Sequence, residues 1–568
     1  MTTAPKTSDP AHAAVGKVRA GRQFWRRGEP FVWASGAALA FTLALTAALL
    51  LIVLVNGMGV FWPHAVAEVR LSDGTRLLGN ELQTEANQET GVESVKFRVG
   101  NAEDGPDFRW VRKEAIVETT WPAGAFVLDR TERLAYFGFL KALDAPALEV
   151  ATDAAPAEQL AAALAAAAER RRRDIVPLQT EQQALARQLE REAELPLMKA
   201  RYRQKQLLAA GQAADSPAVA EVQSRIAELL DHEHELKAAS DQLTGELAQR
   251  EAKLRANVAV FRDAAGREKR IPLVNIVRFA CPNSMGLGAK ISHYLAKLWE
   301  LVSADPRESN QDGGVFPAIF GTVLMVFLMA ITCFPLGVLA GVYLGKYAKE
   351  GPLVRLVRVA VNNLAGIPSI VYGIFGLGFF IYLVGGQLDQ WFFPERLAAG
   401  KPVFGQGCIF WASLTLGLLT VPVVIVSTEE ALRAIPRGVS ESSYALGATK
   451  FQTLWRVLLP MASPGMMTGF ILAMARAAGE VAPLMLTGAI KSAPAPFDAA
   501  PPFVRLDQKF MHLGYHILDI SCKSPNVEAT KPMVYVTTLL LLLIVLTMSS
   551  VAIWLRNRMR KRFQSRTI

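Results

Sequence analysis

Two oppositely charged residues interrupt a long apolar stretch near the C-terminal end of the sequence. Arg476 and Glu480 lie four positions apart, so they would share one face of a helix. A charge at mid-bilayer depth costs at least about 2.5–3.5 kcal/mol, so such residues face a bundle interior or a watery path. The guanidinium group is a planar donor fork that fits the oxygens of an anion. We expect Arg476 to contact an anion in transit and Glu480 to hold or release that arginine, with a purely structural ion pair as the alternative.

A second segment, AGIPSIVYG at residues 365–373, combines helix-breaking residues with polar side chains. Its two glycines and its proline would strain a regular helix. Broken helices inside membranes line cavities, because their freed backbone groups need partners. Asn363, Ser369 and Tyr372 could offer hydrogen bonds in such a cavity. A proline kink with close helix packing is the alternative.

The sequence lacks the motifs of an enzyme. No GxxxxGK[ST] motif is present, so the chain has no phosphate cradle for ATP. His512 and His516 lie four positions apart but have no obvious third ligand, so no metal site is expected. The cysteines are widely spaced and are expected to be free thiols, although Cys281 and Cys522 could in principle pair. We therefore predict a non-catalytic protein without a cofactor of its own.

Six uncharged stretches in the 568-residue chain are each long enough to cross a bilayer, which takes about 20 apolar residues. They are 31–62, 313–345, 359–388, 402–428, 457–475 (continuing to 490) and 532–555. The formal net charge of +10 comes from the two basic ends of the chain. No folded domain carries a basic surplus, which argues against a nucleic-acid partner. The sequence predicts a mainly α integral membrane protein with lipid around its spans.

The loops between these stretches alternate in charge. The connections at 346–358 and 433–456 are rich in lysine and arginine, whereas the connection at 389–401 is balanced. Basic loops stay in the cytoplasm. Both termini are therefore expected in the cytoplasm, and residues 63–312 in a periplasm-like space.

The segment at 63–312 has two kinds of pattern. Residues 66–150 and 258–279 alternate apolar and polar residues around turn signals such as Asp73-Gly74, which is typical of β-strands. Residues from about 155 to 256 repeat apolar side chains every three or four positions, which indicates a coiled coil. Because the turn-like GQAADSP interrupts them, we predict a β domain with an inserted antiparallel coiled-coil hairpin. Residues 287–302 read as an amphipathic helix that leads along the membrane into the second span.

The basic loop before the fifth span carries a specific spacing. It reads ESSYALGATKFQTLWRVLLP from Glu441 to Pro460, which resembles the EAA loop of ABC-importer permeases with Ser-Ser in place of Ala-Ala. The resemblance implies a short coupling helix that docks in an ATPase subunit. The positions that correspond to this motif are Glu441, Ser442, Ser443, Tyr444, Gly447, Leu459 and Pro460. An ordinary amphipathic loop helix is the alternative.

Three further blocks narrow the resemblance. They are NNLAGIPSIVYGIFGLGFF (362–380), TVPVVIVSTEEALRAIPRGVSE (420–441) and MARAAGEVAPLMLTG (474–488). Together they resemble the PstA-type permease subunit of phosphate ABC transporters, over residues 310–568 and in a long variant with an N-terminal extension. The resemblance implies import of inorganic phosphate across the bacterial inner membrane. It also implies a PstC-like permease, a PstB-like ATPase dimer that binds ATP, and a PstS-like periplasmic phosphate-binding protein.

The resulting organisation has five parts: a basic tail (1–30), the first span (31–62), the periplasmic insert (63–312), a five-span permease core (313–556) and a second basic tail (557–568). The insert is expected to dock the binding protein or to brace the partner permease. Two other functions stay open. One is a permease for another oxyanion such as sulfate or molybdate, and the other is a membrane sensor or scaffold that uses the external domain.

Overall fold

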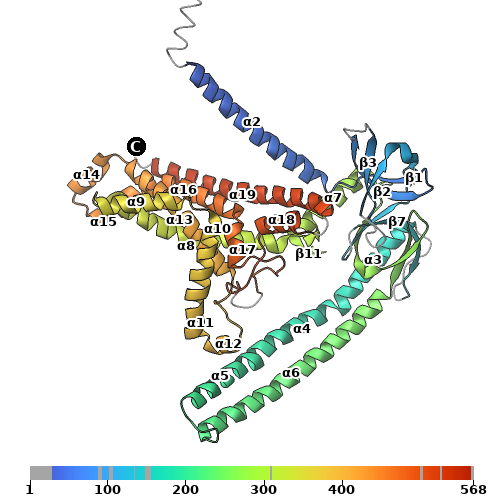
Figure 1. Ribbon diagram of the computed structural model, residues 1–568, viewed down its shortest axis with the longest axis horizontal. Coiled ribbons are helices and arrows are strands. Elements are labelled where there is room, and N and C mark those ends of the chain that lie inside the picture. The colour runs from blue at the N-terminus through green and yellow to red at the C-terminus, as the bar shows by residue number, and fades with distance from the viewer. Residues whose placement is uncertain are drawn as a thin grey trace, which may run out of the picture.

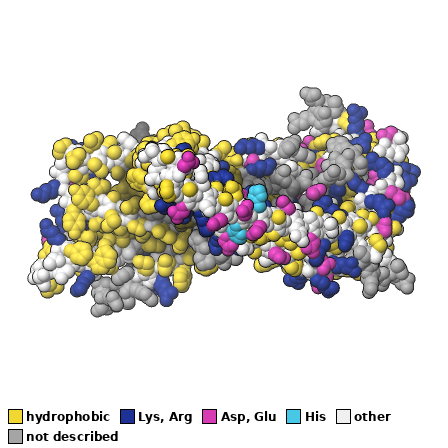
Figure 2. Space-filling model, turned by 90° about the horizontal axis from the view of Figure 1, so that it is seen from below, with side chains coloured by type: hydrophobic (Ala, Val, Ile, Leu, Met, Phe, Trp, Pro, Cys, Tyr) yellow, Lys and Arg dark blue, Asp and Glu magenta, His cyan; other side chains and the backbone are white. Residues whose placement is uncertain are grey.

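A computed structural model describes residues 29–564, except for 87–91, 101–106, 133–134, 147–154, 308–309, 499–502 and 525–526. Most of the predicted tail at 1–30 and the last four residues of the tail at 557–568 lie outside the described residues. A bundle of long helices forms one end of the molecule, and the β-strands form the other end (Figure 1). In Figure 2 hydrophobic side chains dominate the surface of the helical end, whereas charged side chains gather over the β-strands and the hairpin.

Six described helices are long and apolar enough to cross a membrane, which confirms the predicted number of spans. The protein is therefore a multi-pass membrane protein. The spans are α2 (Glu29–Gly59), α8 (Phe316–Val342), α10 to α11 (Ser369–Phe392), α13 (Ile409–Arg433), α16 (Leu459–Gly479) and α19 (Val527–Gln564).

The third span begins about ten residues later than the apolar stretch predicted. The first part of that stretch belongs to a separate helix, α9 (Pro352–Leu364). The chain then turns at 365–368, and α10 (Ser369–Phe375) starts after Pro368. A π-helical segment (Gly376–Gly385) joins α10 to α11 (Gly386–Phe392). The break falls where the sequence predicts it, because a proline removes the backbone donor that a continuous helix needs.

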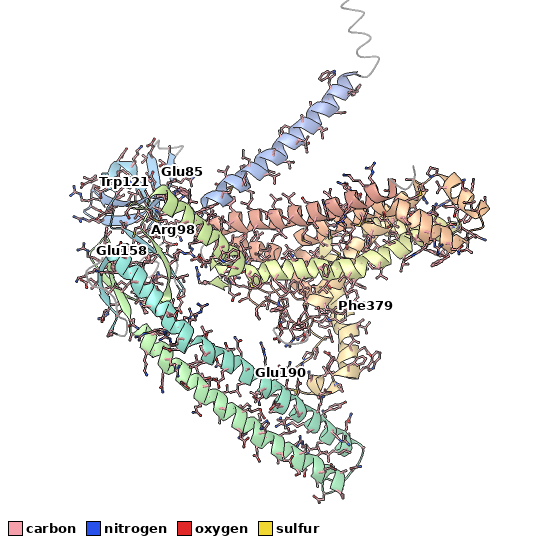
Figure 3. The ribbon with its side chains drawn as sticks, turned by 180° about the vertical axis from the view of Figure 1, so that it is seen from behind. Glu85, Arg98, Trp121, Glu158, Glu190 and Phe379 are labelled. Carbon is pink, nitrogen blue, oxygen red and sulfur yellow. The ribbon has the colours of Figure 1, made fainter. Side chains whose placement is uncertain are left out.

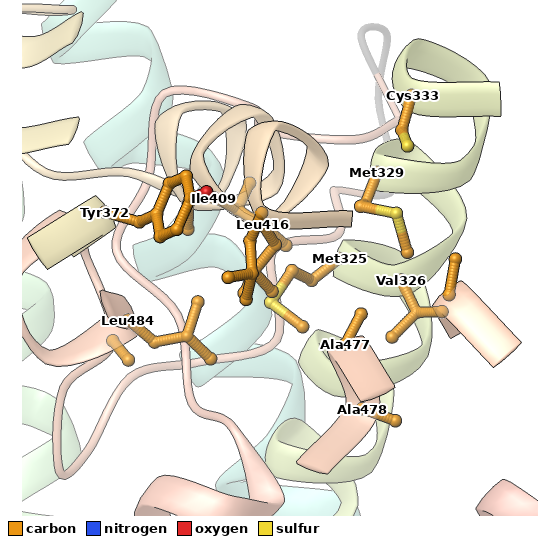
Figure 4. Close-up of a cluster of buried hydrophobic side chains, with 14 of the residues drawn as sticks. Met325, Val326, Met329, Cys333, Tyr372, Ile409, Leu416, Ala477, Ala478 and Leu484 are labelled. Atoms are coloured by element: carbon orange, nitrogen blue, oxygen red, sulfur yellow. The ribbon is translucent and has the colours of Figure 1, made fainter. Parts of the chain in front are cut away.

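The core of the span bundle forms around α13, which packs against α8 on one side and α16 on the other. A buried cluster joins side chains from all three helices with residues of α10 and α17 (Ala482–Thr487) (Figure 4). Its labelled members include Met325, Met329, Leu416, Ala477 and Leu484. Glycines let the helices approach closely, since a Cβ on Gly337 would lie 2.7 Å from the Val424 side chain.

The loop after the third span is held by a buried carboxylate that the sequence analysis missed. Asp389 is fully buried and accepts hydrogen bonds from the backbone amides of Val403, Phe404 and Gly405 at 2.7–3.1 Å. It fixes the loop that contains α12 (Pro394–Ala398) against the end of α11. The loop sequence has as many acidic as basic residues and gives no sign of such a contact.

Ten of the described β-strands form two five-stranded antiparallel sheets with equivalent topologies, which was not predicted from the sequence. The first has the order β4-β3-β2-β1-β5 and the second the order β9-β8-β7-β6-β10. In each sheet a single 3₁₀ turn, 113–115 or 273–275, precedes the last strand. The first-sheet strands are β1 (Val66–Leu71), β2 (Arg76–Ala86), β3 (Glu93–Arg98), β4 (Phe108–Arg112) and β5 (Ile116–Thr120). The second-sheet strands are β6 (Phe126–Arg130), β7 (Tyr136–Asp144), β8 (Val258–Arg262), β9 (Glu268–Pro272) and β10 (Ile276–Ala280).

The insert is therefore a tandem repeat in which the helical segment interrupts the second unit between β7 and β8. Residues 108–122 and 268–282 are the clearest matching segments, because Ile116 and Ile276, and likewise the two prolines that end the segments, occupy equivalent positions. The similarity is short and partial, and the helical insertion separates the two halves of the second unit. Those two facts explain why the repeat was not detected.

The helical segment is a hairpin whose two arms lie side by side (Figure 1). One arm consists of α3 (Pro156–Asp174), α4 (Val176–Gln188), a π-helical segment (Leu189–Glu194) and α5 (Leu195–Ala209), and the other is α6 (Pro217–Arg255). The predicted seam of α6 is buried at Val219, Leu229, Leu236, Leu243, Leu247 and Leu254. Pro177 and Pro196 lie in the first turns of α4 and α5, where no backbone donor is needed. Coiled-coil packing of the arms stays a prediction.

Candidate functional site

Arg476 and Glu480 lie together at the end of α16. Arg476 Nε is 3.4 Å from Glu480 Oε1, and Glu480 is the only ion-pair partner of this arginine within the described part of the chain. The helix ends at Gly479, so the pair forms across the helix end rather than along a continuous helix. A cation near a helix C-terminus is also stabilised by the helix dipole. The Arg476 side chain remains 35% exposed, so part of its donor fork is free for an anion.

The break between α9 and α10 lies near this pair. Tyr372 is buried, and its hydroxyl donates to the backbone carbonyl of Leu364 at 2.7 Å, which satisfies a carbonyl at the end of α9. The same hydroxyl is within electrostatic range of Arg476. Ser369 begins α10 and is half-buried, whereas the Asn363 side chain is exposed on α9. The predicted polar residues therefore surround one helix break, and Tyr372 has a backbone partner there.

A cavity of about 430 Å³ lies between α9, α13 and α16, one helical turn before Arg476 along α16. Its polar lining residues are Asn362, Ser427, Glu430 and Thr468. Leu472 also lines it and lies one helical turn from Arg476, so the arginine and the cavity are on one face of α16. These residues were not predicted from the sequence. The spacing of Thr468, Leu472 and Arg476 was visible, but only packing brings three helices to that face.

The loop before the fifth span forms a short helix and a turn at the end of the molecule opposite the β-strands (Figure 1). Glu441, Ser442, Ser443 and Tyr444 lie on α14 (Arg437–Ala445). Gly447 follows with φ of +84°, a left-handed conformation that favours glycine. The chain continues through α15 (Lys450–Thr453) and a π-helical segment into α16, which begins with Leu459 and Pro460. The residues that the resemblance assigns to the coupling motif therefore form one compact unit.

Large apolar side chains project from this unit. Leu446 is 89% exposed, and Tyr444, Phe451 and Trp455 are also exposed. The Phe451 and Trp455 rings are stacked with centroids 6.3 Å apart. Exposed apolar patches of this kind mark interaction sites on a protein. Phe451 and Trp455 lie inside the predicted motif, but sequence spacing did not single them out.

An ion-pair network links the end of α13, just before this unit, to α9. Glu429 is buried and pairs with Arg358 of α9 at 2.9 Å and with Arg433 at 2.7 Å. Arg358 pairs further with Glu350 at 2.8 Å. The network connects the end of α13, just before α14, with the helix that leads to the break at 365–368. The sequence analysis missed Glu429 because a carboxylate at the end of a span reads as an ordinary loop residue.

No group of three or more His, Cys, Asp or Glu residues that could hold a metal occurs among the described residues. His512 is the buried N-cap of α18 (Leu513–Cys522), and His516 and Asp519 lie on the buried face of that helix. All four cysteines, which include Cys281 and Cys522, are free thiols. Burial lowers the pKa of His512 to about 3 and the pKa of His516 to about 4.

We predict that these two histidines make the protein sensitive to acid. A buried neutral histidine with a pKa below the ordinary 6.5 contributes stability that is complete above pH 6.5 and is lost as the pH falls toward the lowered pKa. Each should cost about 2 kcal/mol between pH 7 and pH 5. The charged neighbours Asp519 and Lys491 partly offset each other at His516. We expect the detergent-solubilised chain to lose thermal stability over this range.

The control is the double variant His512→Asn with His516→Gln. Asparagine keeps a side-chain acceptor at the start of α18, where His512 Nδ1 accepts from the Gly514 amide. Neither replacement titrates, so the fall in melting temperature between pH 7 and pH 5 should be clearly smaller in the variant. An equal fall in both proteins would assign the acid sensitivity to other groups.

Comparison with known proteins identifies the class. A family described as "Binding-protein-dependent transport system inner membrane component" matches residues 334–561. The chain is 30% identical over 224 residues to the probable ABC transporter permease protein YqgI of Bacillus subtilis, a match that spans 38% of this chain and 70% of that protein. It is 39% identical over 174 residues to the phosphate transport system permease protein PstA of Mycobacterium leprae. That match covers 31% of this chain, and the chain spans about half, 51%, of the mycobacterial protein.

Among solved structures, an inward-facing conformation of the MetNI methionine ABC transporter aligns with 46% of this chain and 98% of that chain, with 21% sequence identity and a TM-score of 0.33. Six apolar helices and the sequence matches define a transport permease. The chain belongs to the family of ABC transporter permeases, the inner-membrane components of binding-protein-dependent transport systems. The resemblance drawn from the motif at 441–460 and the PstA-like blocks is thereby confirmed.

Proposed function

We propose that this chain is a permease subunit of an ATP-driven importer of inorganic phosphate. The observation that carries the proposal is Arg476, a partly exposed donor fork in an apolar span, held by a single carboxylate beside a helix break. A fork of this kind can replace part of the hydration of a phosphate ion. The family match at residues 334–561 contains it, and PstA-named proteins are among the relatives of this chain. Asn363, Ser369 and Tyr372 are the other residues proposed along the path.

ATP hydrolysis is assigned to a partner. The unit from Glu441 to Pro460 is proposed as the site that docks a PstB-like ATPase dimer, which binds ATP, so this chain is not an enzyme. The exposed apolar surface around Leu446 supports that role, because such a surface is unfavourable in water until a partner covers it. Movement of this unit would pass through the Glu429–Arg358 pair to α9 and the break.

The proposed location is the bacterial inner membrane, with both termini in the cytoplasm and residues 63–312 in the periplasm. The unit from Glu441 to Pro460, which contains α14, and the β-strands lie at opposite ends of the molecule (Figure 1). This arrangement supports the proposed orientation. A PstC-like permease would complete the path, and a PstS-like binding protein would deliver phosphate from the periplasm. Both partners are inferred from the family resemblance.

The insert has a proposed role within this chain. Three ion pairs join the first hairpin arm to loops of the permease core: Arg187 to Asp498 at 3.2 Å, Glu190 to Arg396 at 3.2 Å and Glu194 to Lys401 at 3.3 Å. Figure 3 shows Glu190 on the arm that runs past the span containing Phe379. We infer that the hairpin braces the loops of its own core, and the expected docking of the binding protein or bracing of a partner permease stays a prediction.

The brace predicts a charge-reversal effect. In Glu190→Arg the new cation would face Arg396, and backbone amides of the loop at 394–401 should exchange hydrogen about two- to fivefold faster. That range corresponds to about 0.5–1 kcal/mol, the value of a partly exposed ion pair. Adding Arg396→Glu should restore slow exchange, as measured by mass spectrometry of loop peptides. Glu228→Arg, which breaks a pair with Arg225 inside the hairpin, is the control. Equal exchange in both single variants would contradict the brace.

Uptake of radiolabelled phosphate in a strain that lacks this chain tests the function. Restoring the chain should restore uptake, and excess sulfate or molybdate should not compete. Competition by either oxyanion would instead assign the permease to that substrate. Normal phosphate uptake without the chain would favour the sensor or scaffold alternative.

A further inference from the structure

Helix α7 (Leu287–Ser303), which joins the second β unit to α8, has its apolar side chains on the outside. Five large apolar residues are exposed along one face: Leu287, Ile291, Leu295, Trp299 and Val302. They are spaced by four, four, four and three positions, so they form one stripe. Trp299 is 73% exposed and Leu295 is 58% exposed. The other exposed residues of α7 are glycine, alanine and serine, so its outer face carries no charge.

Two charged residues of α7, Lys297 and Glu300, lie on the opposite face and hold the helix against the second β unit. Lys297 pairs with Asp129 of β6 at 2.6 Å, and Glu300 pairs with Arg278 of β10 at 3.2 Å. All four side chains are largely buried. Burying charges is costly unless they are paired, so these contacts require this face to point inward. The helix cannot rotate to bury its apolar stripe without breaking both pairs.

This arrangement is the reverse of a helix on a water-soluble domain, whose charged face meets the solvent. The position of α7 indicates what covers the stripe. Tyr294 of α7 contacts Trp62 just after α2, with ring centroids 6.2 Å apart. Only a short ribbon of β11 (Pro306–Arg307) and β12 (Asp312–Gly313) separates α7 from the start of α8. The stripe therefore lies on a helix that is next to the ends of α2 and α8, two of the helices long and apolar enough to cross a membrane.

We propose that α7 is an interfacial anchor whose stripe enters the boundary between lipid headgroups and acyl chains. Helices that lie at this boundary bury an apolar face in lipid, and Trp299 is of the residue type enriched there. The ion pairs on the other face then hold the second β unit at a fixed position relative to the membrane. Because the stripe carries no charge, its occupancy should not require anionic lipids. The proposal depends on the membrane spans and not on the transported substrate.

A photo-crosslinking experiment on the full-length chain tests the anchor. p-Benzoylphenylalanine is introduced at Leu295 or, as a second variant that keeps an aromatic ring, at Trp299. Ala238, an exposed residue of the hairpin, is the matched control. Each protein is illuminated in native membranes with its partners present, and also after reconstitution in phosphatidylcholine vesicles with and without phosphatidylglycerol. Mass spectrometry then identifies the adducts.

Lipid adducts at 295 and 299 should exceed those at 238 by at least tenfold, with equal yields in the two kinds of vesicle. Either of two results would overturn the proposal. Adducts with another polypeptide in native membranes would show that a protein covers the stripe. Lipid adducts no more abundant than at the control position would show that the stripe lies in water.

Discussion

Replacing Arg476 with lysine should lower the rate of phosphate uptake about ten- to a hundredfold while the chain still assembles. Lysine keeps the positive charge near the end of α16 and can still pair with Glu480. It loses the planar fork that binds two oxygens of an anion at once. Hydrogen bonds to charged groups are worth about 1.5–3 kcal/mol each, which sets the expected range. Initial rates of radiolabelled uptake in cells measure the effect.

This substitution separates the two interpretations of the residue. A purely structural ion pair would tolerate lysine, so a variant that assembles normally and transports at the wild-type rate would remove the case for contact with phosphate. Arg225→Lys on the exposed face of the hairpin is the matched control and should transport normally. The amount of each variant in the membrane must be measured together with the rate, because a charge without a partner in a span is costly.

Replacing Leu446 with glutamate should abolish coupling to the ATPase. Leu446 is 89% exposed and makes little contribution to the folded chain by itself. If a partner buries it, loss of the apolar contact costs about 1.5–3 kcal/mol, and burial of an unpaired carboxylate costs more. We expect at least a tenfold loss both of ATPase subunit recovered with the chain and of transport.

The control is Leu208→Glu, which places the same change at an exposed leucine near the end of the first hairpin arm. Both variants should be expressed in the membrane at the same level, since neither side chain belongs to a core. If Leu446→Glu retained the ATPase as well as Leu208→Glu does, the docking site would have to lie elsewhere. Co-purification followed by an ATP hydrolysis assay gives both readouts.

Features that depend on neighbouring residues in the chain could be predicted well. Span number follows from uninterrupted apolar length, and the break at 365–368 follows from the local chemistry of glycine and proline. The unit at 441–460 was recognised from its spacing, and its glycine has the left-handed backbone that a sharp turn requires. The charged pair at Arg476 and Glu480 was found because charges are rare in apolar stretches. The end of α16 between them was not foreseen.

Features that depend on distant segments could not be predicted. The cavity beside α16 requires three helices, and the Glu429–Arg358 pair joins residues 71 positions apart. The repeat of the β unit is hidden by the hairpin inserted in its second copy. The pairs between the hairpin and the core connect residues about 200 to 310 positions apart, and single charged residues in polar segments carry no sign of their partners.

Sequence by itself therefore determined which segments enter the membrane and which loop is suited to meet a partner, because both properties follow from local composition and spacing. Only the tertiary structure decided which face of each helix is covered. Helix α7 is the clearest case, since its sequence predicts an amphipathic helix along the membrane but not what holds that helix in one orientation. Its buried ion pairs with the second β unit settle that question by leaving the apolar stripe outside.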